Sequence, residues 1–307
     1  MPSCLIYRNT CRQYQAWARK VVKKSRDGLT VDRSFQQVEP DKPVRLLWTG
    51  GWDSTFRLLT LISEMGAAVQ PYYIISPERP SSSIELNTMR AIEGICRADP
   101  VRFPGRLLPT ILIDRDTIEL DPGITEQFKK FRKIARVGGQ LEWLARFAKQ
   151  SGIDGFEFCI DSSTSGTRTT LLKQVVPVKR FPTSTHVLKR DHGSDLAIFQ
   201  YFEFPLINVS KKQMETLARE HGFLDVMEMT WFCHRPLNEN WPCGTCNPCR
   251  MAIERGLARR VGWRGRARHR ATRMGEGIWP WITRAKALVP LKFKRALRVY
   301  LYGRDGN

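Results

Sequence analysis

The chain reads Val-Arg-Leu-Leu-Trp-Thr-Gly-Gly-Trp-Asp-Ser-Thr-Phe-Arg-Leu-Leu from Val44 to Leu59, and this stretch decides the fold. The apolar run Val44–Trp48 is typical of a buried strand. The pair Gly50 and Gly51 follows directly, and helical apolar spacing begins near Asp53. The pattern therefore predicts a strand, a tight loop and the N-terminus of a helix in direct succession.

Such a loop suits a phosphate chain. Glycines let the backbone approach a ligand closely, and the first N–H groups of a helix carry a partial positive charge. Thr49, Ser54 and Thr55 add hydroxyl donors, whereas Asp53 fits beside phosphates only with a magnesium ion or a reacting group. The loop has no lysine and lacks the Gly-x-Gly-x-x-Gly spacing, which excludes a Walker A loop and a dinucleotide fingerprint. An ordinary capped turn is the alternative.

Composition favours a globular enzyme core. The chain has 307 residues, of which 42% are hydrophobic, so it can bury a sizeable core. There is no apolar run of membrane-spanning length and no signal-peptide pattern at the N-terminus, so we expect a cytoplasmic protein. Eight cysteines are few for a disulfide scaffold, and four of them fall within residues 233–249, which indicates a metal site.

The positive charge belongs to the two ends of the chain. Of the net charge of +20, residues 1–40 contribute +5, residues 257–307 contribute +12 and the middle only +3. A near-neutral core suits a small-molecule enzyme, whereas the basic ends suit RNA, an anionic membrane surface or an acidic protein partner. Solvated ends without a specific partner are the alternative, and a homodimer is left open.

Strand and helix patterns alternate along the core. The predicted further strands are Ala67–Ile75, Leu107–Ile113, Phe156–Ile160 and Leu206–Val209, and the predicted helices are Ser83–Arg97, Phe128–Arg136, Gln140–Gln150 and Lys211–His221. This order predicts an α/β fold, a parallel sheet with helices on both faces and ligands at the carboxyl ends of the strands. We expect residues 177–198 to form a loop or a lid.

Two further strand ends are candidates for the same cleft. Ile75 and Ser76 end the second strand, where backbone groups can read an adenine edge. Asp161 and Ser163 belong to a polar run after the fourth strand and are candidate substrate contacts. An ordinary Ser/Thr turn is the alternative for that run.

Four cysteines near the C-terminal side have the spacing of a metal site. The predicted ligands are Cys233, Cys243, Cys246 and Cys249, and the two Cys-x-x-Cys steps present successive sulfurs to one tetrahedral ion. Zinc is the first choice, and an iron–sulfur cluster is the chemical competitor. Four thiolates leave no open position, so we expect a structural Zn2+ knuckle.

The loop and the knuckle together resemble a known family. Thr49-Gly50-Gly51-Trp52-Asp53-Ser54 resembles the Ser-Gly-Gly-x-Asp-Ser loop of the PP-loop ATP pyrophosphatases, which share an adenine nucleotide alpha hydrolase-like fold. Thr230–Cys233 and the Cys-Gly-x-Cys-x-x-Cys run from Cys243 are similar to segments of one branch, the 7-cyano-7-deazaguanine synthases or QueC family. Pro205–Lys211 and Glu85 match that branch as well.

The resemblance also has departures. Val137–Leu141 replaces the family's Val-Pro-Gly-Arg-Asn, and only Asp161 and Ser163 match its Asp-x-Ser-Gly-Tyr-Pro-Asp segment. The resemblance therefore implies a retained ATP loop and zinc site but a rebuilt substrate site. The residues that it places on the substrate side are Gly138, Gly139, Gln140, Asp161 and Ser163.

The resemblance implies an ATP-dependent C–N ligase. Residues 49–51 and 53–55 would hold ATP and Mg2+, Asp53, Ser54 and Lys211 would act in catalysis, and the substrates would be a small-molecule carboxylate, such as 7-carboxy-7-deazaguanine, and an amine nucleophile such as ammonia. In the family, the amide is then dehydrated to a nitrile. The alternatives are an RNA sulfurtransferase, for which Cys159 is the one well-placed cysteine, and an ATP-binding sensor without turnover.

These inferences predict four segments. They are a basic N-terminal extension over residues 1–40, a PP-loop α/β domain over 41–230, a zinc-binding segment over 231–256 and a basic, aromatic, helical C-terminal extension over 257–307.

Overall fold

The computed structural model describes residues 42–76, 78–135, 137–162, 167–180, 183–190, 194–238 and 240–274. The chain divides into two compact units, Met1–Phe232 and Cys233–Asn307. The predicted N-terminal extension and the aromatic part of the C-terminal extension, Ile278–Tyr302, lie outside the described residues.

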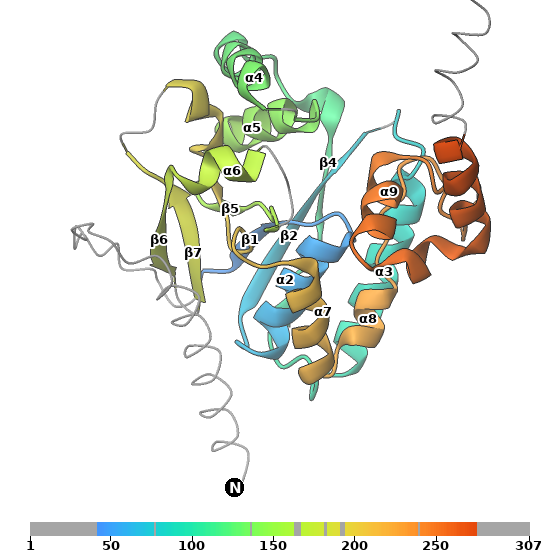
Figure 1. The fold of residues 1–307 in the computed structure, drawn as a ribbon. Coiled ribbons are helices and arrows are strands. Elements are labelled where there is room, and N and C mark those ends of the chain that lie inside the picture. Colours follow the sequence, from blue (N-terminus) through green and yellow to red (C-terminus); the bar gives the residue numbers. More distant parts are fainter. Residues whose placement is uncertain are drawn as a thin grey trace, which may run out of the picture. The chain divides into compact units, whose positions relative to one another are not determined.

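A sheet forms the centre of the first unit (Figure 1). Its strand order is β3-β2-β1-β5-β8-β7-β6, and β4 also pairs with β2. The strands are β1 Val44–Leu47, β2 Ala68–Ile75, β3 Arg106–Leu107, β4 Ile111–Asp114, β5 Phe156–Glu157, β6 Val175–Arg180, β7 Thr183–Leu188 and β8 Phe202–Glu203. The pairs from β3 and β4 through β2, β1 and β5 to β8 are parallel, and the β8–β7 and β7–β6 pairs are antiparallel. The predicted α/β class is confirmed. The predicted parallel sheet is confirmed in part, because an antiparallel hairpin occupies one edge.

Helices cover both faces of this sheet. Among the described residues of the first unit, the α-helices are α2 Trp52–Ser63, α3 Ser82–Ala98, α4 Pro122–Ile134, α5 Gln140–Ser151, α6 Thr167–Leu172, α7 Lys211–Glu220 and α8 Leu224–Glu228. Side chains alternate across a strand, and Tyr72 joins the buried cluster with α4 and α5 while its neighbour Tyr73 bonds to Glu85 of α3. On the α3 side, α2 packs against α7 and α8, with the rings of Phe56 and Phe223 6.1 Å apart.

The predicted fifth strand is wrong in position. Residues 205–208, which overlap the predicted strand Leu206–Val209, form a turn, and the strand is β8, just before Pro205. Proline has no N–H for a sheet ladder, so it ends the pairing there. The strand β8 was not predicted because it contains Glu203, and a carboxylate is seldom buried. Here it is 7% exposed and accepts a bond from Arg180 Nε at 2.9 Å.

The predicted loop or lid over residues 177–198 is also wrong for its first half. Residues 175–180 and 183–188 form the β6–β7 hairpin, and Val187 of β7 pairs with Glu203 of β8. Pro177 interrupts the apolar pattern, yet it is tolerated because β6 is an edge strand. In the same way Pro109 splits the predicted third strand into β3 and β4.

No helix within the described part of the chain has both the length and the apolarity needed to span a membrane.

The second unit is built on a close approach of two glycines. It contains α9, Asn247–Glu254, a 3-10 turn over Ala258–Val261 and helical residues 262–274. A Cβ on Gly244 would lie 1.8 Å from the Gly265 carbonyl oxygen, so both glycines are needed for the knuckle to touch this helix. Arg264 stacks over the Trp241 ring, with Cζ 3.3 Å from the ring centre. The described part of the basic C-terminal extension is therefore helical from residue 262.

An ion pair between helix ends predicts how stability depends on pH. His221 Nδ1, after α7, lies 2.8 Å from Glu64 Oε2, after α2. The bond to Glu64 raises the pKa of His221 above 6.5, although partial burial opposes it. Burial would raise the pKa of Glu64, but the bonds from His221 and Ser63 lower it below 4.5.

We therefore expect His221→Gln to lower the free energy of unfolding by up to about 1 kcal/mol, most strongly between pH 4.5 and 6.5. The raised pKa makes the contribution of His221 complete below pH 6.5 and lost as the pH rises through the folded value, and Glu64 loses its contribution as the pH falls through its own lowered value. Urea unfolding across this pH range measures the difference. A constant difference up to pH 9 would contradict the ion pair.

Candidate functional site

The loop between β1 and α2, called the α2 loop below, is held from two sides. Gly50 has φ +65°, and a Cβ there would lie 3.1 Å from Met89 Cγ and 3.3 Å from the Glu85 carbonyl oxygen of α3. Only glycine satisfies both the left-handed backbone and this close approach. From the other side the Trp231 backbone N–H donates to the Gly50 carbonyl oxygen at 2.9 Å. The Thr230–Phe232 segment thus fixes the loop, although it lies far along the chain.

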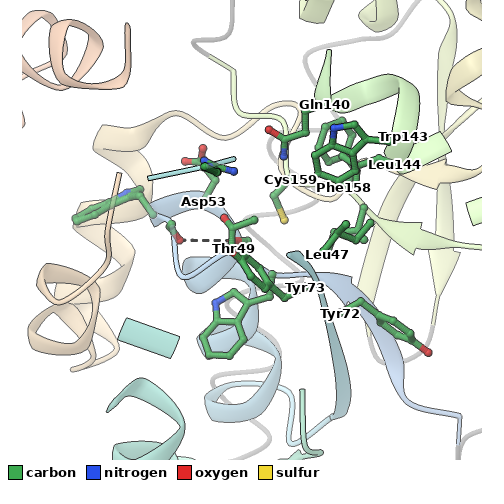
Figure 2. Close-up of a pocket in the computed structure, with 16 residues that line it drawn as sticks. Leu47, Thr49, Asp53, Tyr72, Tyr73, Gln140, Trp143, Leu144, Phe158 and Cys159 are labelled. Atoms are coloured by element: carbon green, nitrogen blue, oxygen red, sulfur yellow. Dashed lines mark hydrogen bonds between the residues drawn. The ribbon is translucent and has the colours of Figure 1, made fainter. Parts of the chain in front are cut away.

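The N-terminus of α2 is left without a side-chain cap within the described structure. Gly51 is the N-cap residue, and the first helical bond runs from the Thr55 N–H to the Gly51 carbonyl oxygen at 3.0 Å. The Ser54 hydroxyl turns back to the loop and accepts from the Thr49 N–H at 3.4 Å, the dashed bond in Figure 2. A helix start of this kind is a binding site for anions.

Thr55 has a different role from its neighbours. Its side chain is fully buried, and its Oγ1 accepts a bond from the Trp48 indole Nε1 at 3.0 Å. This bond ties α2 to the end of β1, so Thr55 holds the loop in place and does not line the pocket.

Lys211 links three parts of the site. It is the first residue of α7, where Ser210 and Gln213 form a capping box. Its ammonium group pairs with Asp53 Oδ1 and lies 3.3 Å from Asp161 Oδ2. Asp161 is 1% exposed, so this is a mostly buried cluster of two carboxylates and one ammonium.

This cluster keeps Lys211 charged. Burial by itself lowers the pKa of Lys211, but the charges of Asp53 and Asp161 and their hydrogen bonds outweigh it and raise the pKa above 10.5. Asp53 therefore has its counter-ion in the protein. The carboxylate at the first turn of α2 is therefore balanced within the protein.

A pocket opens beside the loop at the carboxyl ends of β1, β2 and β5. Its volume is about 140 Å³, and it is lined by Leu47, Trp48, Thr49, Gly51, Trp52, Asp53, Ser54, Tyr72, Tyr73, Ile74, Arg79, Gln140, Trp143, Leu144, Phe158 and Cys159. In Figure 2, Gln140, Trp143, Leu144 and Phe158 gather on one side, and Asp53 lies across from them. One wall is therefore polar and belongs to the α2 loop, and the other is aromatic.

Several of the predicted site residues do not line this pocket. The Ser76 hydroxyl accepts from Arg115 at 3.0 Å, and Ile75 is replaced on the wall by Ile74. Gly138 and Gly139 are exposed before α5, and only Gln140 of that group reaches the pocket. Asp161 contacts the site through Lys211, and Ser163 lies outside the described residues. Gly50 packs against α3 and does not line the pocket.

Sequence reasoning missed most of the apolar wall. Tyr73 and Phe158 belong to predicted strands that end at the pocket, so the rule that ligands bind at carboxyl ends of strands would have found them. Trp143 and Leu144 carry no such signal, because their helical spacing is that of any buried helix face. Arg79, in the loop after β2, was missed as well.

In the second unit the structure brings the four predicted cysteine ligands together. All four Sγ atoms lie within 4.8 Å of one another, and the Cys243–Cys249 and Cys246–Cys233 sulfur pairs are 3.9 Å apart. Zinc–thiolate bonds of about 2.3 Å in a tetrahedron place sulfurs about 3.8 Å apart. The backbone N–H groups of Cys243 and Cys246 donate to Sγ atoms at 3.2 and 3.3 Å, as expected for thiolates. The donor set fits a closed, structural zinc site.

This geometry predicts one zinc ion per chain. Cys246→Ser should lower the zinc content of purified protein well below one equivalent and lower the temperature of unfolding, because structural zinc contributes to folding. Cys159→Ser is the matched control, since Cys159 lies in the first unit and outside this cluster. Elemental analysis measures the metal. Iron in place of zinc, or unchanged zinc in Cys246→Ser, would contradict the assignment.

One comparison with known families bears on the site. The family model described as queuosine biosynthesis protein QueC matches residues 189–259. The match includes Lys211 and all four clustered cysteines, and the Val44–Leu59 stretch lies outside it. No curated protein matches the chain. The QueC match, which contains the cysteine cluster and the lysine paired to the α2 loop, supports assignment of this chain to the QueC-like PP-loop family.

Proposed function

We propose that this chain is an ATP-dependent enzyme of the QueC type that adenylates a small-molecule carboxylate and transfers the acyl group to an amine. The observation that carries the proposal is Lys211, inside the matched segment, paired to Asp53 at the first turn of α2. This pair joins the family-matched part of the chain to the uncapped helix N-terminus, a site suited to phosphate.

The α2 loop would bind the phosphates of ATP. The N-terminal amides of α2 and the Ser54 hydroxyl offer donors, and the Thr49 side chain lines the same wall. The pocket of about 140 Å³ is smaller than a typical nucleotide site, so ATP would extend beyond it. Backbone groups near Ile75 and Ser76 would then read the adenine edge.

Magnesium would enter with ATP. Asp53 is the one carboxylate among the described pocket-lining residues, and its oxygen chemistry fits Mg2+. Lys211 holds one carboxylate oxygen of Asp53 and thereby orients the other. Bound magnesium would neutralise phosphate charge.

The reaction would proceed in two displacements. A substrate carboxylate oxygen attacks the α-phosphorus, the bond from that phosphorus to the bridging oxygen breaks, and pyrophosphate leaves. The amine nitrogen then attacks the acyl carbon, AMP leaves with the oxygen between carbon and phosphorus, and the nitrogen loses a proton to solvent. Lys211 would stabilise negative charge that develops on the phosphates.

The aromatic wall would receive the substrate. Trp143 and Phe158 offer flat apolar surfaces, and the Gln140 amide offers a donor and an acceptor. These features suit a planar acid such as 7-carboxy-7-deazaguanine or a related compound. Gln140 and Leu141 stand where the family pattern has Arg and Asn, so selectivity should differ. Zinc in the second unit would be structural.

An RNA sulfurtransferase is the second candidate. Cys159 does line the pocket, which favours it. However, burial raises the pKa of the Cys159 thiol well above 9, and the negative charge of Glu157 adds to this effect. Thiolates are the reactive form, so this cysteine is poorly suited to sulfur transfer. An ATP-binding sensor would bind nucleotide without forming AMP.

The first experiment combines zinc-loaded protein, ATP, magnesium, ammonium and 7-carboxy-7-deazaguanine. We expect AMP and pyrophosphate in equal amounts, together with the amide or the nitrile, detected by chromatography and mass spectrometry. ATP binding without AMP, after other carboxylates are screened, would overturn the enzyme assignment in favour of the sensor.

Lys211→Gln should lower the rate of AMP formation about 100- to 1,000-fold, because it removes the cation beside the phosphates. Lys212→Gln is the matched control, since Lys212 is the exposed neighbour on α7. Equal rates for the two variants would show that Lys211 serves folding alone.

A further inference from the structure

A buried hydrogen-bond network follows β2 and reaches the pocket wall. Glu85, in the first turn of α3, is 3% exposed. The Tyr73 hydroxyl donates to its Oε2 at 3.0 Å, and the Ser81 hydroxyl donates to its Oε1 at 2.8 Å. Arg79 Nη2 lies 3.1 Å from the same Oε1, and Arg79 Nε donates to Ser81 Oγ at 3.2 Å. The network therefore fixes the Arg79 guanidinium at two nitrogens.

One end of this guanidinium remains available. Its Nη1 group has no bonding partner within the described residues, and the Arg79 side chain is 24% exposed. Arg79 is also the only cationic side chain among the described residues that line the pocket. A planar guanidinium held on one edge presents its other edge in a defined direction.

The charge of the α2 loop calls for such a cation. Lys211, Asp53 and Asp161 together carry a net charge of −1, because one ammonium faces two carboxylates. The partial charge of the α2 N-terminus offsets about half of a unit charge. A polyphosphate of several negative charges therefore needs a further cation from the pocket wall, besides any metal that it brings.

We propose that Arg79 binds the phosphate chain of the nucleotide and that Glu85 is its positioning residue. This inference rests on the proposed function, because it assumes that the pocket takes ATP. It adds to the site a residue from the loop after β2, whereas the α2 loop comes after β1. The two strands are parallel neighbours, so their carboxyl ends present both groups to one ligand.

A purely structural role is the competing explanation for Arg79. A buried carboxylate needs donors, and Arg79 supplies one. However, Tyr73 and Ser81 already donate to both oxygens of Glu85. A structural role predicts lower stability without any selective loss for phosphate-bearing ligands. The comparison of ATP with adenosine separates the two explanations.

The test is a binding titration of full-length, zinc-loaded protein with ATP–magnesium and with adenosine. Trp48, Trp52 and Trp143 line the pocket, so tryptophan fluorescence can report binding. Arg79→Gln should weaken ATP binding about 10- to 100-fold, because it removes one charge-assisted hydrogen bond to the phosphates. Adenosine affinity should stay within about twofold of that of the unchanged protein.

Arg90→Gln is the matched control. Arg90 is exposed on α3, bonds to Asn87 and does not line the pocket, and its substitution changes the net charge equally. It should bind both ligands as the unchanged protein does. If Arg79→Gln fails to fold, Arg79→Lys keeps the charge and should weaken ATP binding severalfold without affecting adenosine. Equal loss for both ligands, or no loss, would overturn the inference.

Positioning by Glu85 has its own readout. Glu85→Gln should weaken ATP binding less than Arg79→Gln does, and the double variant should be no weaker than Arg79→Gln alone. Losses that add would show that Glu85 acts independently of Arg79.

The failures of the two proposals are distinguishable. If the unchanged protein binds neither ATP nor adenosine, both the proposed function and this inference fall. If ATP binds and AMP forms while Arg79→Gln matches the unchanged protein, only the inference falls. A higher KM for the carboxylate with unchanged ATP affinity would assign Arg79 to the substrate acid and would also overturn it.

Discussion

The site in the first unit depends on one buried ammonium group. Lys211 brings the first turn of α7 to Asp53 of α2 and to Asp161 after β5. Without it, two neighbouring carboxylates would repel each other in a place where one of them is 1% exposed. The opposing charges keep Lys211 protonated, because they raise its pKa despite burial. A charged lysine held between two carboxylates beside an uncapped helix start is the electrostatic basis of the proposed chemistry.

The pocket follows from parallel pairing. β1, β2 and β5 are neighbours with the same direction, so the residues after each strand meet at one edge of the sheet. The α2 loop follows β1, Arg79 lies in the loop after β2, and Cys159 lies just after β5. Trp231 then holds the Gly50 carbonyl from a distant segment.

The second unit is organised by different physics. The four sulfurs gather around a position suited to zinc. Gly244 and Gly265 let the knuckle touch the helix at residues 262–274, which explains why glycine interrupts the arginine run. The helix at residues 262–274 therefore packs against the cysteine knuckle, independently of any ligand that its arginines bind.

The sequence by itself determined the features that short segments encode. The strand, loop and helix around Gly50 and the cysteine spacing follow from neighbouring residues, and the alternating order of strands and helices gave the mostly parallel sheet. Only the tertiary structure decided which distant groups meet. Asp53 and Lys211 are 158 positions apart, and the strand with Glu203 is recognisable only once Arg180 is beside it. A charged residue has no periodic signal of its own, and the partner that allows its burial is chosen by packing.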